Sequence, residues 1–219
     1  MADDLLRFDI ESFLRWMNAV RRPFCTIEEL LADIDEKKQL AGAFQLWITS
    51  AILSTAVSVV MSALVVGQKT EIKDALYYFV FGMLLFLLTV FILHLCLRLF
   101  GIASVFSKTA VLQSVIVCYS PMAAVFFVPW LLKPTRTLPQ WVGRADYTGL
   151  LYNIFRYDSL PGLRYLGWCL PLLSTILYAL LVEAICNVYN ASRMRTQLAL
   201  ITSGYLSAIV PIVLYFAAR

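Results

Sequence analysis

Residues 75–97 read ALYYFVFGMLLFLLTVFILHLCL, and His94 is the only titratable side chain in this stretch apart from Cys and Tyr. An α-helix rises about 1.5 Å per residue, so about 20 apolar residues cross the roughly 30 Å hydrocarbon core of a bilayer. The stretch is apolar on every side, whereas strands of a membrane barrel alternate between apolar and polar positions. It therefore predicts a membrane-spanning helix over 75–98.

Four further stretches are long and apolar in the same way: 41–67, 109–132, 165–190 and 196–217. Hydrophobic residues make up 61% of the chain and charged residues 15%, against about 45–50% and about 25% in soluble domains. This composition excludes soluble enzymes, secreted disulfide scaffolds and disordered chains. We predict an all-α polytopic membrane protein, with a bundle of five transmembrane helices over residues 41–219.

Residues 1–40 predict two amphipathic helices ahead of the first span. The first helix carries an apolar stripe and ends at Pro23, and the second begins with a capping box formed by Thr26 and Glu29. The apolar positions are Leu6, Ile10, Phe13, Leu14, Met17 and Val20 in the first helix, and Ile27, Leu30, Leu31 and Ile34 in the second. Two arrangements are open: the helices lie in the membrane interface, or they pack on the helix bundle.

The distribution of Lys and Arg predicts the orientation of the chain in the membrane. The N-terminal segment, the 98–108 loop and the 191–195 turn hold ten of these residues, and the alternate side holds eight. This excess favours a cytoplasmic N-terminus and an external C-terminus. The 133–164 loop is then external, and its aromatic residues favour an interfacial plug, with a binding lid as the alternative.

Two ionisable residues fall inside predicted spans, His94 in the second and Glu183 in the fourth. A charged side chain at the bilayer centre costs at least about 2.5–3.5 kcal/mol, so it generally faces a partner or water. Both residues are expected at a similar depth in the cytoplasmic half, which predicts a pair between Glu183 and either His94 or Arg98. The pair is interpreted as a structural hydrogen bond, with an ion or proton relay and a partner-binding contact as the alternatives.

The sequence carries no motif of a known enzymatic chemistry and no pattern typical of a metal, cofactor or nucleic-acid site. Its five cysteines show no paired spacing. We therefore expect no catalytic residue, no metal and no cofactor. Within the spans, Pro121, Pro171 and Pro211 are expected to interrupt helices. A stripe formed by Ser50, Ser54, Ser58 and Ser62 is suited to close helix packing.

Three short segments carry a resemblance to a known family. They are Arg21-Arg22-Pro23-Phe24, Gly101-Ile102-Ala103-Ser104-Val105-Phe106-Ser107-Lys108 and Cys118-Tyr119-Ser120-Pro121. Together with five spans, they resemble the bacterial Yip-domain proteins of the Ypt/Rab-interacting membrane protein family. Gly101, Lys108, Tyr119 and Pro121 stand at the positions of the family motifs. The chain departs from the pattern, because its basic pair precedes Pro23 and Tyr119 stands only two positions before Pro121.

The resemblance implies a non-enzymatic protein of the bacterial inner membrane that acts as a scaffold or accessory subunit. Eukaryotic relatives bind prenylated small GTPases, but this chain lacks their long polar N-terminal tail, so that partner is not inferred. The expected partners are the lipid bilayer and either other membrane proteins or further copies of the chain. Two alternatives are a small transporter or channel using His94 and Glu183, and a lipid-modifying membrane enzyme.

Overall fold

A computed structural model of the chain describes residues 10–66, 72–123 and 161–217, and within these ranges every regular element is helical. The helices are α2 (Ile10–Arg21), α3 (Pro23–Leu31), α4 (Glu36–Val66), α5 (Ile72–Leu99), α6 (Phe106–Val117), α9 (Pro161–Tyr189) and α10 (Arg193–Ala217). The predicted all-α fold is confirmed for the described part of the chain. The first nine residues and residues 133–160 of the predicted 133–164 loop lie outside it, whereas residues 161–164 belong to α9, so the predicted end of the loop is wrong.

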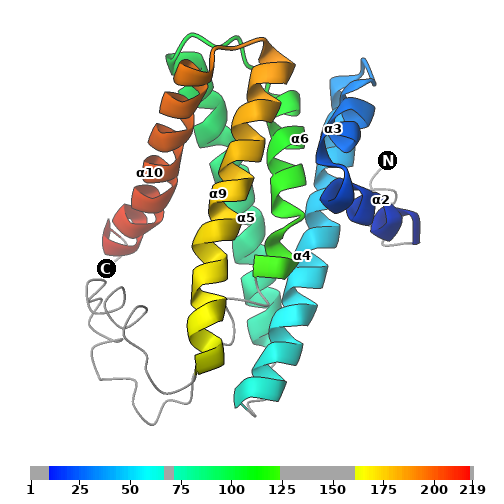
Figure 1. Cartoon of the computed structure of the whole chain (residues 1–219), viewed down its shortest axis with the longest axis vertical. Coiled ribbons are helices and arrows are strands. Elements are labelled where there is room, and N and C mark those ends of the chain that lie inside the picture. The colour runs from blue at the N-terminus through cyan, green and yellow to red at the C-terminus, as the bar shows by residue number, and fades with distance from the viewer. Residues whose placement is uncertain (1–9, 67–71, 124–160, 218–219) are drawn as a thin grey trace.

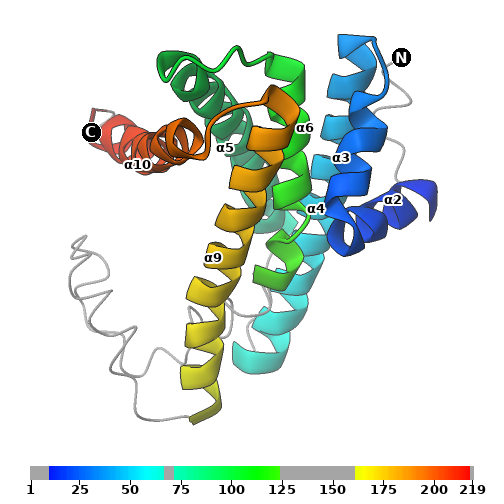
Figure 2. The same cartoon turned by 45° about the horizontal axis from the view of Figure 1, so that its top comes forward.

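The long helices connect at a common end of the bundle. The α3–α4 turn, the α5–α6 connection and the α9–α10 turn all lie at the top of Figure 1. α2 runs crosswise to α4, as the views in Figures 1 and 2 agree, and α3 then leads up to the start of α4.

Three helices are long and apolar enough to cross a membrane, judged by length and composition of the described residues. The qualifying segments are Glu36–Val60 in α4, Gly82–Leu99 in α5 and Leu172–Tyr189 in α9. The structure thus supports membrane-spanning helices in three of the five predicted places. α10 covers the fifth predicted stretch as a continuous helix, while the third predicted stretch is described only to residue 123.

The predicted capping box and the predicted start of the first span are wrong. α3 begins at Pro23, because proline presets the helical backbone angle and lacks the N–H that a first turn leaves unpaired. Thr26 therefore lies inside the helix and is buried, so it forms no capping box. α4 begins at Glu36, earlier than residue 41, because Asp35 Oδ1 accepts a hydrogen bond from the Lys37 amide at 2.9 Å and caps the helix.

α5 and α9 end in the same way. After α5, Gly101 has a φ of 75°, and the Ile102 amide donates to the Leu97 carbonyl oxygen at 2.9 Å. After α9, Asn190 has a φ of 49°, and the Ala191 amide donates to the Cys186 carbonyl oxygen at 3.2 Å. Both ends are Schellman motifs, in which a left-handed residue lets the chain turn back and satisfy the last carbonyls.

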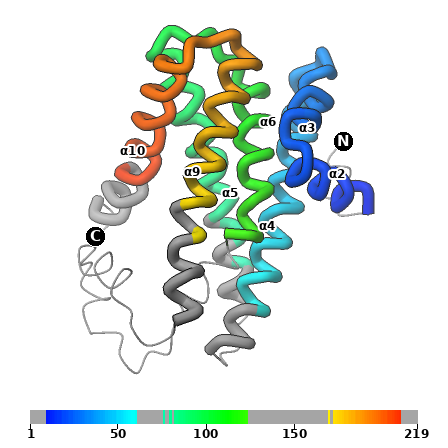
Figure 3. Tube along the Cα trace, viewed as in Figure 1, coloured from blue at the N-terminus to red at the C-terminus, as the bar shows by residue number. Residues whose placement is uncertain are grey.

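The third predicted span is not one continuous helix from 109. α6 starts earlier, at Phe106, and ends at Val117, followed by a turn at 118–119 and helical residues 120–123. Pro121 explains the end, because it has no N–H to donate to the Val117 carbonyl and its ring crowds that carbonyl. In Figure 3 α6 ends beside the middle of α4. By contrast, α9 and α10 continue through Pro171 and Pro211 without a break.

The core forms around the contact between α4 and α6, where small and hydroxyl-bearing residues let the helices approach closely. Ser107 Oγ donates to the Gln39 side-chain oxygen at 2.8 Å, and both residues are buried. Further along, Ser50 is buried and its Oγ lies 3.5 Å from Cys118 Sγ. Ser50 thus lies at a helix interface as expected of the serine stripe, while the side chain of Ser62 lies outside the described ones.

Candidate functional site

The structure gives His94 and Glu183 separate partners. His94 Nδ1 lies 3.0 Å from the hydroxyl of Ser104, which also donates to the His94 carbonyl oxygen at 3.2 Å. Arg98 Nε contacts the carbonyl oxygen of the same serine at 3.4 Å. The three residues therefore hold the chain between α5 and α6 against the end of α5.

Glu183 pairs with Arg193, the first residue of α10, through a contact of 3.0 Å between Glu183 Oε2 and Arg193 Nη2. The side chains are 41% and 74% exposed, respectively. This contact differs from the predicted pairing of Glu183 with His94 or Arg98. The physical reason is the tight α9–α10 turn, which returns the chain directly over the last turns of α9 and brings an arginine within reach.

The four residues expected at motif positions from the resemblance have distinct structural roles. Gly101 supplies the left-handed residue after α5, and Pro121 follows the end of α6. Lys108 lies in the first turn of α6 and is half-buried. Tyr119 donates its hydroxyl hydrogen to the Val20 carbonyl oxygen at 2.9 Å, which links the end of α6 to the last turn of α2. The motif positions therefore lie at helix ends and do not meet in one site.

A second bond joins the same two segments. The indole Nε1 of Trp16 donates to the Cys118 carbonyl oxygen at 3.0 Å. We call Trp16, Val20, Cys118 and Tyr119 the α2–α6 latch. Sequence reasoning missed it, although a signal existed. Pro121 predicts a helix end with free carbonyls nearby, and a buried indole N–H needs an acceptor.

α2 is also joined to α4 through a polar contact centred on Gln45. Its side-chain amide donates to Ser12 Oγ at 2.6 Å, and its side-chain oxygen accepts from Arg15 at 2.8 Å. Arg15 also lies 3.5 Å from Glu11. Since a glutamine amide offers both donors and acceptors, one side chain of α4 holds two residues of α2 in register.

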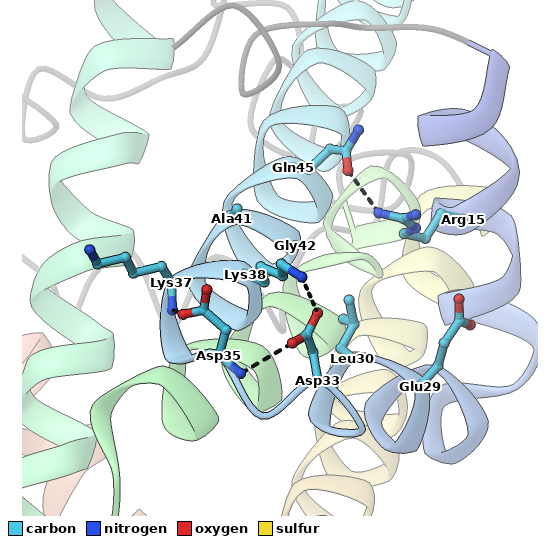
Figure 4. A pocket seen from close by; sticks show the side chains of 10 residues that line it. All are labelled: Arg15, Glu29, Leu30, Asp33, Asp35, Lys37, Lys38, Ala41, Gly42 and Gln45. Atoms are coloured by element: carbon cyan, nitrogen blue, oxygen red, sulfur yellow. Dashed lines mark hydrogen bonds and ion pairs between the residues drawn. The ribbon is translucent and has the colours of Figure 1, made fainter. Parts of the chain in front are cut away.

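A cavity of about 560 Å³ opens between α2, α3 and the first turns of α4 (Figure 4). Acidic and basic side chains line it together with the Gln45 contact, and Lys38 pairs with Asp33 across 3.7 Å. The charged lining residues are Arg15, Glu29, Asp33, Asp35, Lys37 and Lys38. Charged groups of both signs thus border the cavity, which lies along α4 on the Glu36 side of Gln45.

The helical bundle and its three apolar helices define a helical membrane protein. Comparison with protein-family models, with curated proteins and with solved structures finds no significant match.

Proposed function

We propose that the chain is a non-enzymatic, multi-pass protein of the bacterial inner membrane that acts as a scaffold or accessory subunit for membrane or partner proteins. In this proposal five helices cross the membrane, the N-terminus is cytoplasmic and the C-terminus is external. The connected end of the bundle, where Arg98, Lys108, Arg193 and Arg195 lie near the helix turns, then faces the cytoplasm, which agrees with the positive-inside rule.

The observation that favours a scaffold is the way polar side chains are used. In the described ranges, buried side-chain nitrogen and oxygen atoms all have hydrogen-bond partners. The bonds connect neighbouring elements, as between Thr109 and Tyr189 at 2.9 Å and between Gln39 and Ser107 at 2.8 Å. A relay needs titratable groups that face one another or water, but His94 and Glu183 bond to different neighbours. This pattern is typical of a bundle built for rigidity.

The scaffold role is tested by covalent cross-linking in cells, followed by purification in mild detergent and quantitative mass spectrometry. We expect a membrane protein, or a second copy of the chain, in stoichiometric amounts. Recovery of the chain alone at every cross-linker concentration would contradict the proposal.

The transporter alternative is tested in proteoliposomes loaded with a pH-sensitive dye. We expect no proton or ion flux above empty vesicles for the parent protein or for Glu183→Gln. Arg193→Gln is the matched control, because it breaks the same ion pair but keeps the carboxylate. A flux that is lost in Glu183→Gln and retained in Arg193→Gln would replace the scaffold with a carboxylate-dependent transporter.

The five-span topology is tested by reporter fusions at the N-terminus and at Arg136. Three predicted spans separate the two sites, so we expect the reporters on opposite sides of the membrane. Both reporters on the same side would exclude the topology.

A further inference from the structure

α2 has three edges that differ in chemistry and in burial. The docked edge is Ser12, Trp16 and Ala19, the polar edge is Glu11, Arg15 and Asn18, and the apolar edge is Ile10, Phe13 and Leu14. On the docked edge, Ser12 and Ala19 are fully covered by the bundle. On the apolar edge, Ile10 is 80% exposed and Leu14 is 50% exposed. At about 100° per residue, the polar edge lies about 100° to one side of the docked edge, and the apolar edge lies about 145° to the other side.

The contacts of Arg15 show which way the polar edge points. Arg15 bonds to Gln45 and lines the charged cavity together with Gly42 and Lys38, which precede Gln45 in α4. The polar edge of α2 therefore faces the Glu36 end of α4. The apolar edge lies on the opposite side of the docked edge, so it points away from the bundle and toward the Val66 end, with Phe13 nearest to that direction.

The surface of α4 toward which the apolar edge points is itself apolar and exposed. Gln45, Ile52 and Val59 are spaced seven residues apart, so they share one face of the helix. Ile52 and Val59 are exposed, and the neighbouring Val60 is 54% exposed. These residues belong to a segment that is long and apolar enough to cross a membrane. α2 thus lies at the N-terminal end of this apolar, exposed stripe on α4, which we interpret as facing lipid.

The length of α4 below this point fits a bilayer. From Gln45 to Val66, where α4 ends, a rise of about 1.5 Å per residue gives about 31 Å. The hydrocarbon core of a bilayer is about 30 Å thick. The crosswise α2 and the end of α4 are therefore separated by one membrane thickness.

From these observations we propose that α2 is an in-plane membrane helix that lies on the bilayer surface at the level of Gln45. Its partner is the lipid itself. Ile10, Phe13 and Leu14 insert at the boundary between headgroups and acyl chains, the Gln45 contact and the α2–α6 latch hold the docked edge, and the polar edge and charged cavity face water. An amphipathic helix with these separate faces is suited to that position.

This inference rests on the chain being a membrane protein and not on its proposed scaffold role. A transporter could carry the same in-plane helix, so failure of either proposal leaves the other standing.

The test uses spin labels on the full chain in vesicles of phosphatidylcholine and phosphatidylglycerol. Phe13→Cys labels the apolar edge, and Glu11→Cys is the matched control on the polar edge, since both residues are exposed and lie about 160° apart around the helix. Cys25→Ser, which removes an exposed thiol, is the background for both variants and reports any label on the remaining cysteines. Collision with molecular oxygen measures contact with lipid, and collision with a water-soluble nickel chelate measures contact with water.

We expect the label at residue 13 to collide several-fold more with oxygen than with the nickel chelate, and the label at residue 11 to show the reverse. Equal access of the chelate to both labels would mean that α2 is solvated and would overturn the proposal. Protection of residue 13 from both reagents would also overturn it, because protein and not lipid would then cover the edge. Ile10→Cys repeats the comparison with Glu11→Cys and excludes an effect of one label on folding.

Discussion

The indole of Trp16 donates a hydrogen bond to the carbonyl oxygen of Cys118 at 3.0 Å, although 102 positions separate the two residues. In the opposite direction, the hydroxyl of Tyr119 donates to the carbonyl oxygen of Val20 at 2.9 Å. The last carbonyls of a helix have no partner within it. A carbonyl oxygen at each helix end thus accepts a hydrogen bond from an aromatic side chain of the other segment. The two bonds together fix the position of α2 on the bundle.

Tyr119→Phe removes one bond of the α2–α6 latch and keeps the ring. A typical intramolecular hydrogen bond contributes about 1 kcal/mol, so we expect α2 to open about fivefold more often. Proteolysis of an element that opens and closes rapidly follows its open population. Limited proteolysis in detergent should therefore cut the α2–α3 region about fivefold faster in the variant.

Tyr205→Phe is the control for this experiment, because Tyr205 lies exposed on α10, where removal of a hydroxyl should change nothing. Trp16→Phe should have an effect similar to that of Tyr119→Phe. The double variant should add less than the sum, because both bonds join the same two segments. Unchanged cleavage in all three latch variants would show that other contacts hold α2.

The helices could be predicted from the sequence, because a long apolar run without charges can adopt few structures other than a helix, whether water or lipid surrounds it. The contacts between them could not. Estimated depth predicts a pair between Glu183 and either His94 or Arg98, whereas the α9–α10 turn brings Arg193 to Glu183. Depth gives the height of a residue along the bundle but not the direction of its side chain. Arg193, in the adjoining turn, can therefore pair with Glu183 in place of a residue on another helix.

The same limit applies to α2. Its amphipathic pattern predicts one apolar face. In the structure the helix has two apolar faces, one that packs on the bundle and one that is exposed. Ala19 packs into the core, whereas Ile10 is largely exposed. The spacing of apolar residues predicts that one face of a helix is shielded from water, but it does not show whether protein or lipid covers that face.

Ser104→Ala tests the contact that holds the α5–α6 connection. Ser104 is buried, and its hydroxyl serves both the ring and the carbonyl of His94. Loss of this partner from a buried polar group costs about 1–3 kcal/mol. We expect a lower thermal midpoint in detergent, with partial recovery in Ser104→Thr, which keeps the hydroxyl. Ser174→Ala, at an exposed position inside α9, should not lower the midpoint. An equal decrease there would show that the assay is not specific to the His94 contact.

Glu183→Gln and Arg193→Gln test the energetic value of the ion pair. Both side chains are substantially exposed, and exposed ion pairs contribute about 0–1 kcal/mol. Each variant should therefore stay within about 1 kcal/mol of the parent in denaturant titrations, and the double variant should cost no more than either single one. A much larger loss in Glu183→Gln alone would mean that the carboxylate has a second, structurally important partner.

Gly101→Ala tests why a glycine stands between α5 and α6. Gly101 has a φ of 75°, and the nearest atom to an added Cβ, Arg195 Nη1, would be 3.7 Å away. There is room for the methyl group, so any cost comes from the backbone conformation and amounts to about 1–2 kcal/mol for an L-residue in the left-handed region. Asn190 adopts the same region after α9, and asparagine tolerates it better than alanine. Gly101→Asn should therefore lower the thermal midpoint less than Gly101→Ala.

Gly204→Ala is the control in which the same substitution should stabilise the protein. Gly204 lies within α10 with no atom near the added Cβ, and alanine should stabilise the helix there by about 0.5–1 kcal/mol. If Gly101→Ala matched the parent while Gly204→Ala raised the midpoint, the left-handed turn after α5 would not be a requirement of the fold.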